Sequence, residues 1–187
     1  PPKAVVIDPD TLKTLPARQI SNGLAEAIKM SATSDRELFE YFERADTADE
    51  GFFDFVITRS LMIKKKVVEE DERESGLRRV LNFGHTLAHA IESVCGFGKF
   101  YHGECVALGM LFMSGDDVRC RLEKILEKFS LPTEYCANAD ELLEVCRHDK
   151  KLMGDKIALV WVERVGEFEF RTVPFSELEK IICEVKK

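Results

Sequence analysis

The segments 82–92, NFGHTLAHAIE, and 101–104, YHGE, contain three of the four histidines of the chain. His85 and His89 are four positions apart in a run with helical apolar spacing, so on a helix they lie on one face, one turn apart. Two neutral imidazoles placed this way can both bind one metal ion, or one can bind while the other transfers protons. A pair of hydrogen-bonded structural histidines would give the same spacing.

The residue that follows His85 excludes one class of zinc enzyme. Zinc proteases with an HExxH motif need a Glu directly after the first His as general base, and this chain has Thr86 there. His102 follows the loop 97–100 and precedes a new helical run, so it can point back at the earlier helix. Catalytic metal sites often combine two His with one carboxylate and leave one position open for a substrate oxygen.

Glu26 is one of many carboxylates that could complete such a site, and spacing alone does not choose among them. It stands among apolar neighbours in the segment 23–30, GLAEAIKM, three positions before Lys29. An exposed ion pair between Glu26 and Lys29 explains this pattern at least as well.

Basic residues gather at 64–66, 78–79 and 150–151. Arg forks and Lys point charges are the usual anchors for phosphate and carboxylate groups. Each of these groups, taken singly, is more often a solvated helix face.

The apolar spacing from about Pro16 to Lys128 is helical and predicts an α-helical array. The segments 34–37 and 47–50 have the form of capping boxes, which mark helix starts, and Pro132 marks a break. The expected helices cover residues 17–33, 35–45, 49–70, 79–95, 103–114, 117–129 and 139–148.

The ends of the chain have β patterns. Segments 156–162 and 168–171 flank a turn with Gly166 and predict a β-hairpin, after which Ser176 caps a last helix. Residues 4–8, AVVID, form a β-like run, which either pairs with a late strand or is the last strand of a domain left out. We expect a mainly α fold: a multi-helix domain with a small hairpin near the C-terminus and a short N-terminal strand.

The composition indicates a folded unit and excludes several partners. With 187 residues and 45% hydrophobic content, the chain can bury a substantial core. Its formal charge of −7 gives no broad basic surface, so we expect neither nucleic acid nor membrane as a partner. We find no apolar run of ~20 residues and no secretory leader pattern. The six cysteines form no CxxC pair, so we expect buried, reduced thiols in a cytoplasmic protein.

Together, these motifs resemble the dehydroquinate synthases, a family of sugar-phosphate cyclases. The matching segments follow the family's order and spacing along nearly the whole chain: LPARQ at 15–19, GLAEAIK at 23–29, KKKVV at 64–68, DERESGLR at 71–78, LNFGHT at 81–86 and HGE at 102–104. The resemblance implies that residues 1–10 are the last strand and linker of an absent NAD-binding domain. Residues 11–187 would then be the α-helical metal- and substrate-binding domain.

The resemblance also implies roles for individual residues. A divalent metal, usually zinc and otherwise cobalt, would be bound by Glu26, His85 and His102. His89 and Glu74 would not bind the metal but would assist proton transfer. The residues that would hold the hydroxyls, the carboxylate and the phosphonate-like end of the substrate are Lys29, Lys64, Arg78, Asn82 and one of Lys150 and Lys151. The local spacing does not decide between the last two.

The implied reaction converts a seven-carbon sugar-acid phosphate, 3-deoxy-arabino-heptulosonate 7-phosphate, into 3-dehydroquinate and phosphate on the shikimate pathway to aromatic amino acids. It begins with hydride transfer to NAD, which acidifies the neighbouring proton and permits loss of phosphate. This chain has no GxGxxG fingerprint after a strand. We therefore expect NAD only in the full-length enzyme, a homodimer in this family, and no turnover by a chain that is a fragment or a truncated gene product.

Three alternatives remain at this point. Cyclases that make deoxy-inosose or valiolone compounds share the framework, although Asn82 and His89 favour the dehydroquinate type. Metal-dependent polyol dehydrogenases have a similar plan but lack the ESGLR and NFGHT combination of residues 74–78 and 82–86. A non-catalytic helical module that binds a partner or a metal is the alternative from a different class.

Overall fold

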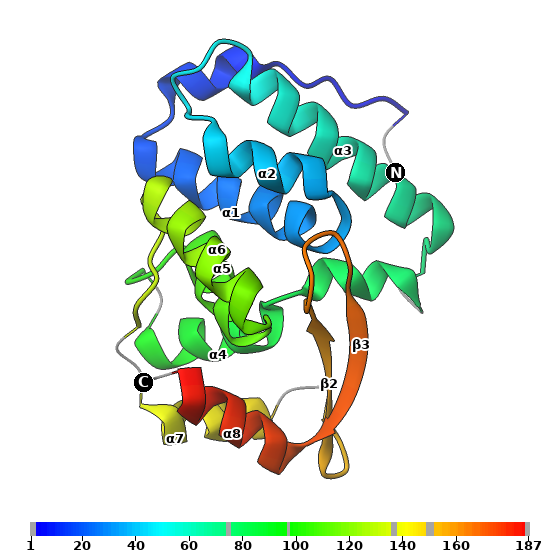
Figure 1. The fold of residues 1–187 in the computed structure, drawn as a ribbon, viewed down its shortest axis with the longest axis vertical. Helices are drawn as coiled ribbons and strands as arrows, with labels where there is room; N and C mark the ends of the chain where they lie inside the picture. The colour runs from blue at the N-terminus through cyan, green and yellow to red at the C-terminus, as the bar shows by residue number, and fades with distance from the viewer. Residues whose placement is uncertain (1–2, 74–75, 97, 136–137, 149–151, 186–187) are drawn as a thin grey trace.

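The computed structural model describes residues 3–73, 76–96, 98–135, 138–148 and 152–185, and these form a mainly helical fold (Figure 1). This confirms the predicted fold class, including the hairpin near the C-terminus. The elements follow the order η1 (Pro9–Thr14), α1 (Ala17–Ser34), α2 (Arg36–Arg44), α3 (Phe52–Glu70), η2 (Leu77–Asn82), α4 (His85–Cys95), α5 (His102–Phe112), α6 (Asp116–Lys128), α7 (Ala139–Arg147), β1 (Leu152–Met153), β2 (Lys156–Trp161), β3 (Glu169–Pro174) and α8 (Phe175–Val185).

Helix α5 lies at the centre of the fold. All its residues from Gly103 to Phe112 are buried, as expected for a helix that is apolar on every side. Helices α1, α4, α6 and α8 all contact it. In Figure 1, α1, α2 and α3 lie on one side of this centre and α7 and α8 on the other, while the hairpin runs between the two groups.

The prediction of one continuous helix over 79–95 is wrong. The chain forms the 3-10 turn η2 and then starts α4 at His85, after Gly84 in the left-handed region at φ +77°. A Cβ on Gly84 would lie 2.9 Å from the backbone nitrogen of Met110, and a Cβ on Gly109 would overlap the carbonyl oxygen of Gly84. The two glycines therefore let the start of α4 pack directly on the backbone of α5.

The three-stranded antiparallel sheet has the order β1-β2-β3. The predicted hairpin is β2 and β3, with Ile157 opposite Val173, while the short strand β1 was not predicted. Beyond β2, Val162 donates a hydrogen bond to the carbonyl of Met113 and accepts one from Gly115. These bonds attach the hairpin to the end of α5.

Residues 4–8 do not form the predicted N-terminal strand. They are extended and exposed, with Val5, Val6 and Ile7 exposed by 72%, 92% and 46%. A single strand has no stability without a partner strand, and the described sheet lies at the other end of the chain.

The cysteines only partly follow the expectation of buried thiols. Cys105 and Cys146 are buried, Cys95 is half-buried, and Cys120 and Cys183 are exposed. Burial, followed by the charge of Glu92, raises the pKa of Cys105 to about 12. Among the described residues, none of the helices is both long enough and apolar enough to cross a bilayer.

Two predicted helix starts are displaced. The side chain of Asp35, rather than that of Ser34, caps α2 by accepting a hydrogen bond from the N–H of Leu38. Segment 47–50 lies in a turn, and α3 begins at Phe52 after Gly51, whose φ is +76°.

Asp35 also joins α2 to α3, because its carboxylate accepts two hydrogen bonds of 2.8 Å from Arg59. Burial alone would raise the pKa of Asp35, but the bonds from Arg59 and Leu38 outweigh it and hold the pKa below the usual 3.8. The ionised form is thus bound more strongly by the folded state, so its stabilising contribution is present above pH 3.8 and is lost as the pH falls through the lowered pKa.

We predict that Asp35→Ala lowers the free energy of unfolding by roughly 1–3 kcal/mol at pH 7, because it removes a cap and an ion pair. The difference from wild type should shrink as the pH falls below about 3.8. Urea unfolding at several pH values measures it. Asp116→Ala is the control, since Asp116 is 97% exposed and its pair with Arg119 should contribute under about 1 kcal/mol. A loss that is independent of pH down to 2 would contradict the prediction.

Candidate metal centre

The fold brings together three side chains from three helices: Glu26 from the middle of α1, His85 from the start of α4 and His102 from the start of α5. One donor atom from each lies within 4.8 Å of the other two. Nε2 of His85 and Nε2 of His102 each lie 3.8 Å from Oε1 of Glu26. These are the three residues for which the resemblance implies a metal.

The carboxylate of Glu26 supports a cation at this point. Its Oε2 accepts a hydrogen bond of 2.6 Å from Lys29, whereas its Oε1 is buried and has no hydrogen-bond partner in the described structure. A buried oxygen without a partner costs about 1–3 kcal/mol, or more when it is charged. Two donors bound to one tetrahedral zinc ion are about 3.4 Å apart, close to the separation observed here. A divalent ion between Oε1 and the two imidazoles would satisfy all three groups.

The predicted Glu26–Lys29 pair exists, but it is buried at one end. The Lys29 side chain is only 4% exposed, whereas Glu26 is 39% exposed. Burial lowers the pKa of Lys29, and the charge of Glu26 opposes this effect. Burial would raise the pKa of Glu26, but the charge and the hydrogen bond of Lys29 contribute most to lowering it overall. Lys29 therefore holds the Glu26 carboxylate in its ionised form and in a fixed position.

His85 is well suited to bind a metal through Nε2. Its side chain is 13% exposed, and burial, followed by the charge of Lys29, lowers its pKa to about 4. The ring is therefore neutral at pH 7. Its Nδ1 donates a hydrogen bond of 3.2 Å to the carbonyl of Phe83, which leaves the lone pair on Nε2 for an ion.

The first turn of α5 is fixed to α1 by contacts that sequence reasoning missed. Arg18 donates hydrogen bonds of 2.6 and 2.7 Å to the two carboxylate oxygens of Glu104. The N–H of Gly103 donates one of 2.6 Å to the side chain of Asn22, and a Cβ on Gly103 would overlap the carbonyl oxygen of Asn22. Glu26 lies one turn after Asn22 and His102 directly before Gly103, so these contacts set the distance between the two ligands.

Other predicted site residues surround this cluster. The ring centroid of His89 lies 5.8 Å from that of His85 and 6.3 Å from that of His102, on an exposed face. Lys64 is exposed on α3, and its charge contributes to the lowered pKa of Lys29. Both residues therefore lie near the proposed ligands.

Arg78 and Asn82 lie on the segment before α4. Arg78 is half-buried and donates a hydrogen bond of 2.9 Å to the carbonyl of Glu72. Asn82 ends η2 and, with Thr86 and the hairpin, lines a hollow of about 310 Å³. Glu74, Lys150 and Lys151 lie outside the described residues.

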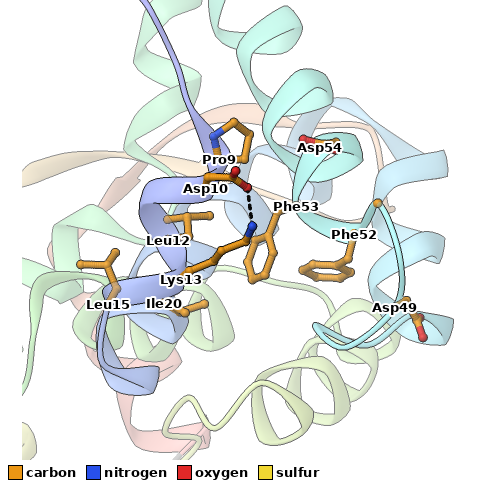
Figure 2. A pocket seen from close by; sticks show the side chains of 11 residues that line it. Pro9, Asp10, Leu12, Lys13, Leu15, Ile20, Asp49, Phe52, Phe53 and Asp54 are labelled. Carbon is orange, nitrogen blue, oxygen red and sulfur yellow. Dashed lines mark ion pairs between the residues drawn. The ribbon is translucent and has the colours of Figure 1, made fainter.

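Two other hollows lie near the N-terminal segment. Figure 2 shows one of about 300 Å³ between η1 and the start of α3, where Asp10 pairs with Lys13 at 2.8 Å; it contains no predicted site residue. A second, mostly apolar hollow of about 310 Å³ lies between α1 and α3 and includes Glu26 in its lining. Space for a ligand beside the cluster is therefore available on the α1 and α3 side.

The sequence contained a signal for one further neighbour of the cluster. Glu92 is seven positions after His85 on the same helix, which places both on one face. Its Oε1 lies 2.9 Å from Nδ1 of His102. Arg18, Asn22 and Glu104 carry no comparable signal, because their contacts join positions more than eighty residues apart.

We predict that Gly103→Ala separates α5 from α1 and lowers the free energy of unfolding by roughly 1–3 kcal/mol, as overpacking does. Chemical denaturation measures the change. Gly23→Ala is the matched control, because Gly23 is on α1 and a Cβ there meets nothing within 4 Å. It should be neutral or stabilising by up to about 1 kcal/mol. Equal stabilities of the two variants would show that the close approach at Gly103 is unimportant.

Comparison with known proteins shows which family the sequence matches. A family model described as 3-dehydroquinate synthase C-terminal matches residues 23–152. The 3-dehydroquinate synthase of Streptococcus suis (strain 05ZYH33) is 40% identical over 190 residues, which cover 95% of this chain and 54% of the relative. That of Sulfurovum sp. (strain NBC37-1) is 41% identical over 175 residues, covering 88% of this chain and 50% of the relative. The chain thus spans about half the length of these curated relatives.

Solved structures share the fold at lower identity. ValA, the 2-epi-5-epi-valiolone synthase from Streptomyces hygroscopicus subsp. jinggangensis 5008 with NAD+ and Zn2+ bound, has a TM-score of 0.83 at 23% identity, covering 96% of this chain and 54% of ValA. A 2-deoxy-scyllo-inosose synthase complexed with carbaglucose-6-phosphate, NAD+ and Co2+ has a TM-score of 0.79 at 21% identity, covering 95% of this chain and 54% of that chain. With both the sequence match and the fold in agreement, the chain belongs to the 3-dehydroquinate synthase family, in which it corresponds to the C-terminal part.

Proposed function

We propose that this chain is the metal- and substrate-binding part of a 3-dehydroquinate synthase, a lyase that converts 3-deoxy-arabino-heptulosonate 7-phosphate into 3-dehydroquinate and phosphate. The observation that carries the proposal is the convergence of Glu26, His85 and His102 with one carboxylate oxygen left unsatisfied. The 40% identity to named 3-dehydroquinate synthases supports this choice of reaction.

The metal in this proposal is a divalent ion, with zinc first and cobalt as an alternative. Two imidazoles and one carboxylate are a typical donor set for catalytic zinc and leave a position open. Held by Glu26, His85 and His102, such an ion would supply Lewis-acid chemistry: it would polarise a substrate hydroxyl and so assist hydride transfer to NAD. The Zn2+ bound in the valiolone synthase structure and the Co2+ in the deoxy-inosose synthase structure support this assignment.

The residues around the ligands would bind and orient an anionic substrate. Lys64 places a positive charge near Lys29. His89 is exposed close to both ligand histidines, where it can accept or donate a proton. Arg78 and Asn82 would contact the carboxylate and hydroxyl groups of the substrate. Roles for Glu74 in proton transfer and for Lys150 or Lys151 in anion binding stay predictions.

The same proposal assigns metal and substrate binding to one domain and NAD binding to another. We assign residues 11–187 to metal and substrate binding, and residues 1–10 to the last strand and linker of an NAD-binding domain. The exposure of Val5, Val6 and Ile7 supports a partner strand for this segment. NAD, and a homodimer, belong to the full-length enzyme in this scheme.

Two alternative functions predict different results in assays of the full-length protein. The structural neighbours make valiolone or deoxy-inosose compounds, but they are only 23% and 21% identical to this chain, against 40% for a 3-dehydroquinate synthase. Sugar phosphates offered to the full-length enzyme would separate these substrates. A non-catalytic metal-binding module would bind the ion without supporting any turnover in the full-length protein.

We predict that the purified chain binds close to one Zn2+ and that Glu26→Gln and His85→Ala each weaken binding at least 100-fold, because each removes one of three ligands. Equilibrium dialysis with elemental analysis measures the bound ion. Glu43→Gln is the control: Glu43 lies on α2 and is bonded to Arg121, so zinc binding should not change. Unchanged zinc content in both ligand variants would refute the site.

We predict that the 187-residue chain with Zn2+ and NAD releases no phosphate from 3-deoxy-arabino-heptulosonate 7-phosphate, whereas the full-length protein does. The reason is that hydride transfer needs NAD held against the substrate, and the fit of both depends on a shared cleft. A phosphate-release assay on both proteins tests this. Dehydroquinate formation by the 187-residue chain would refute the division into two domains, and inactivity of the full-length protein would refute the reaction.

A further inference from the structure

We propose that Glu92 is a positioning residue: its carboxylate holds the His102 ring so that Nε2 points at the metal position. The Oε1 atom of Glu92 lies 2.9 Å from Nδ1 of His102, and Nε2 of the same ring lies 3.8 Å from Oε1 of Glu26. The two ring nitrogens flank Cε1 in one rigid planar ring, so their directions are fixed relative to each other. A bond that fixes Nδ1 therefore also fixes the direction of the Nε2 lone pair.

His102 needs such a bond more than His85 does. The His85 side chain is 13% exposed and its Nδ1 is bonded to the backbone carbonyl of Phe83, which belongs to the same turn. The His102 side chain is 46% exposed and stands at the first position of α5. Packing alone leaves an exposed ring free to change rotamer. The hydrogen bond to Glu92 removes this freedom before an ion binds.

Glu92 is itself held in place by the fold. It lies two turns after His85 on α4, and its side chain is 26% exposed. The start of α4 packs on α5 through Gly84 and Gly109, which fixes the two helices against each other. The bond between Glu92 and His102 thus joins two helices in fixed positions. It connects α4, which carries the proposed ligand His85, to the side chain of His102 on α5.

The chemistry of a carboxylate suits this task. A carboxylate is only an acceptor, so Nδ1 of His102 must carry the hydrogen and Nε2 must carry the free lone pair. The negative charge also makes Nε2 a stronger electron donor, as in other carboxylate–histidine–metal arrangements. Gln at position 92 would keep an acceptor without the charge, and Ala would remove both.

This inference rests on the proposed metal site, and Co2+ is the probe because its visible absorption reports the geometry of its ligands. We expect Glu92→Ala to weaken Co2+ binding roughly 10- to 100-fold and to change the absorption band, since mutation of such outer partners typically has this effect. Glu92→Gln should lie between Ala and wild type. Glu43→Ala is the matched control, because Glu43 is 33% exposed and bonded to an Arg on another helix; it should bind Co2+ as wild type does.

A double variant tests whether Glu92 acts through His102. In a His102→Ala background, Glu92→Ala should change the Co2+ dissociation constant less than twofold, because the ring that it orients is gone. Competition with a chelating dye gives each constant, and circular dichroism checks folding. If Glu92→Ala does not fold, Glu92→Gln carries the test, and wild-type affinity with an unchanged band in that variant overturns the proposal.

Two other results overturn it as well: wild-type affinity in a folded Glu92→Ala variant, or an equal loss with and without His102. These outcomes differ from a failure of the metal site itself. If wild type binds Co2+ and Glu26→Gln does not, the site stands whatever Glu92 does. If wild type and Glu26→Gln bind Co2+ equally, the proposed function fails.

Discussion

The close approach of α5 to the backbones of α1 and α4 is the constraint on which the site depends. At one end of α5, Gly103 contacts the main chain of Asn22, and further along Gly109 contacts that of Gly84. Main-chain contacts have no rotamers, so the three helices that carry the candidate ligands hold fixed relative positions. This arrangement places one donor atom each of Glu26, His85 and His102 within 4.8 Å of the other two.

The site combines this rigid frame with an incomplete set of polar contacts. Lys29 is almost fully buried and bonded to Glu26, yet the second oxygen of Glu26 has no hydrogen-bond partner within the described structure. A buried network of this kind is unfavourable for stability unless each member is satisfied. Polar groups that lower stability in this way are typical of functional sites.

Much of this arrangement follows from local patterns, because long helices and hairpins have strong periodicity. The helices around α5 and the hairpin of β2 and β3 were predictable in this way. The break at Gly84 was not, because a positive φ becomes necessary only when α5 packs against that residue. The three proposed ligands followed from the family resemblance rather than from spacing. The clamp between Arg18 and Glu104 joins residues 86 positions apart, which no local pattern reveals.

The extended segment at residues 4–8 has a practical consequence for anyone who handles this chain. Val5 and Val6 present apolar side chains to water on a backbone that belongs to no described strand. Such a segment is a template on which another polypeptide can add a strand. Concentrated solutions of the chain should therefore tend toward aggregation that starts at this segment, and a polar replacement of Val6 is the first change to make for crystallisation or NMR.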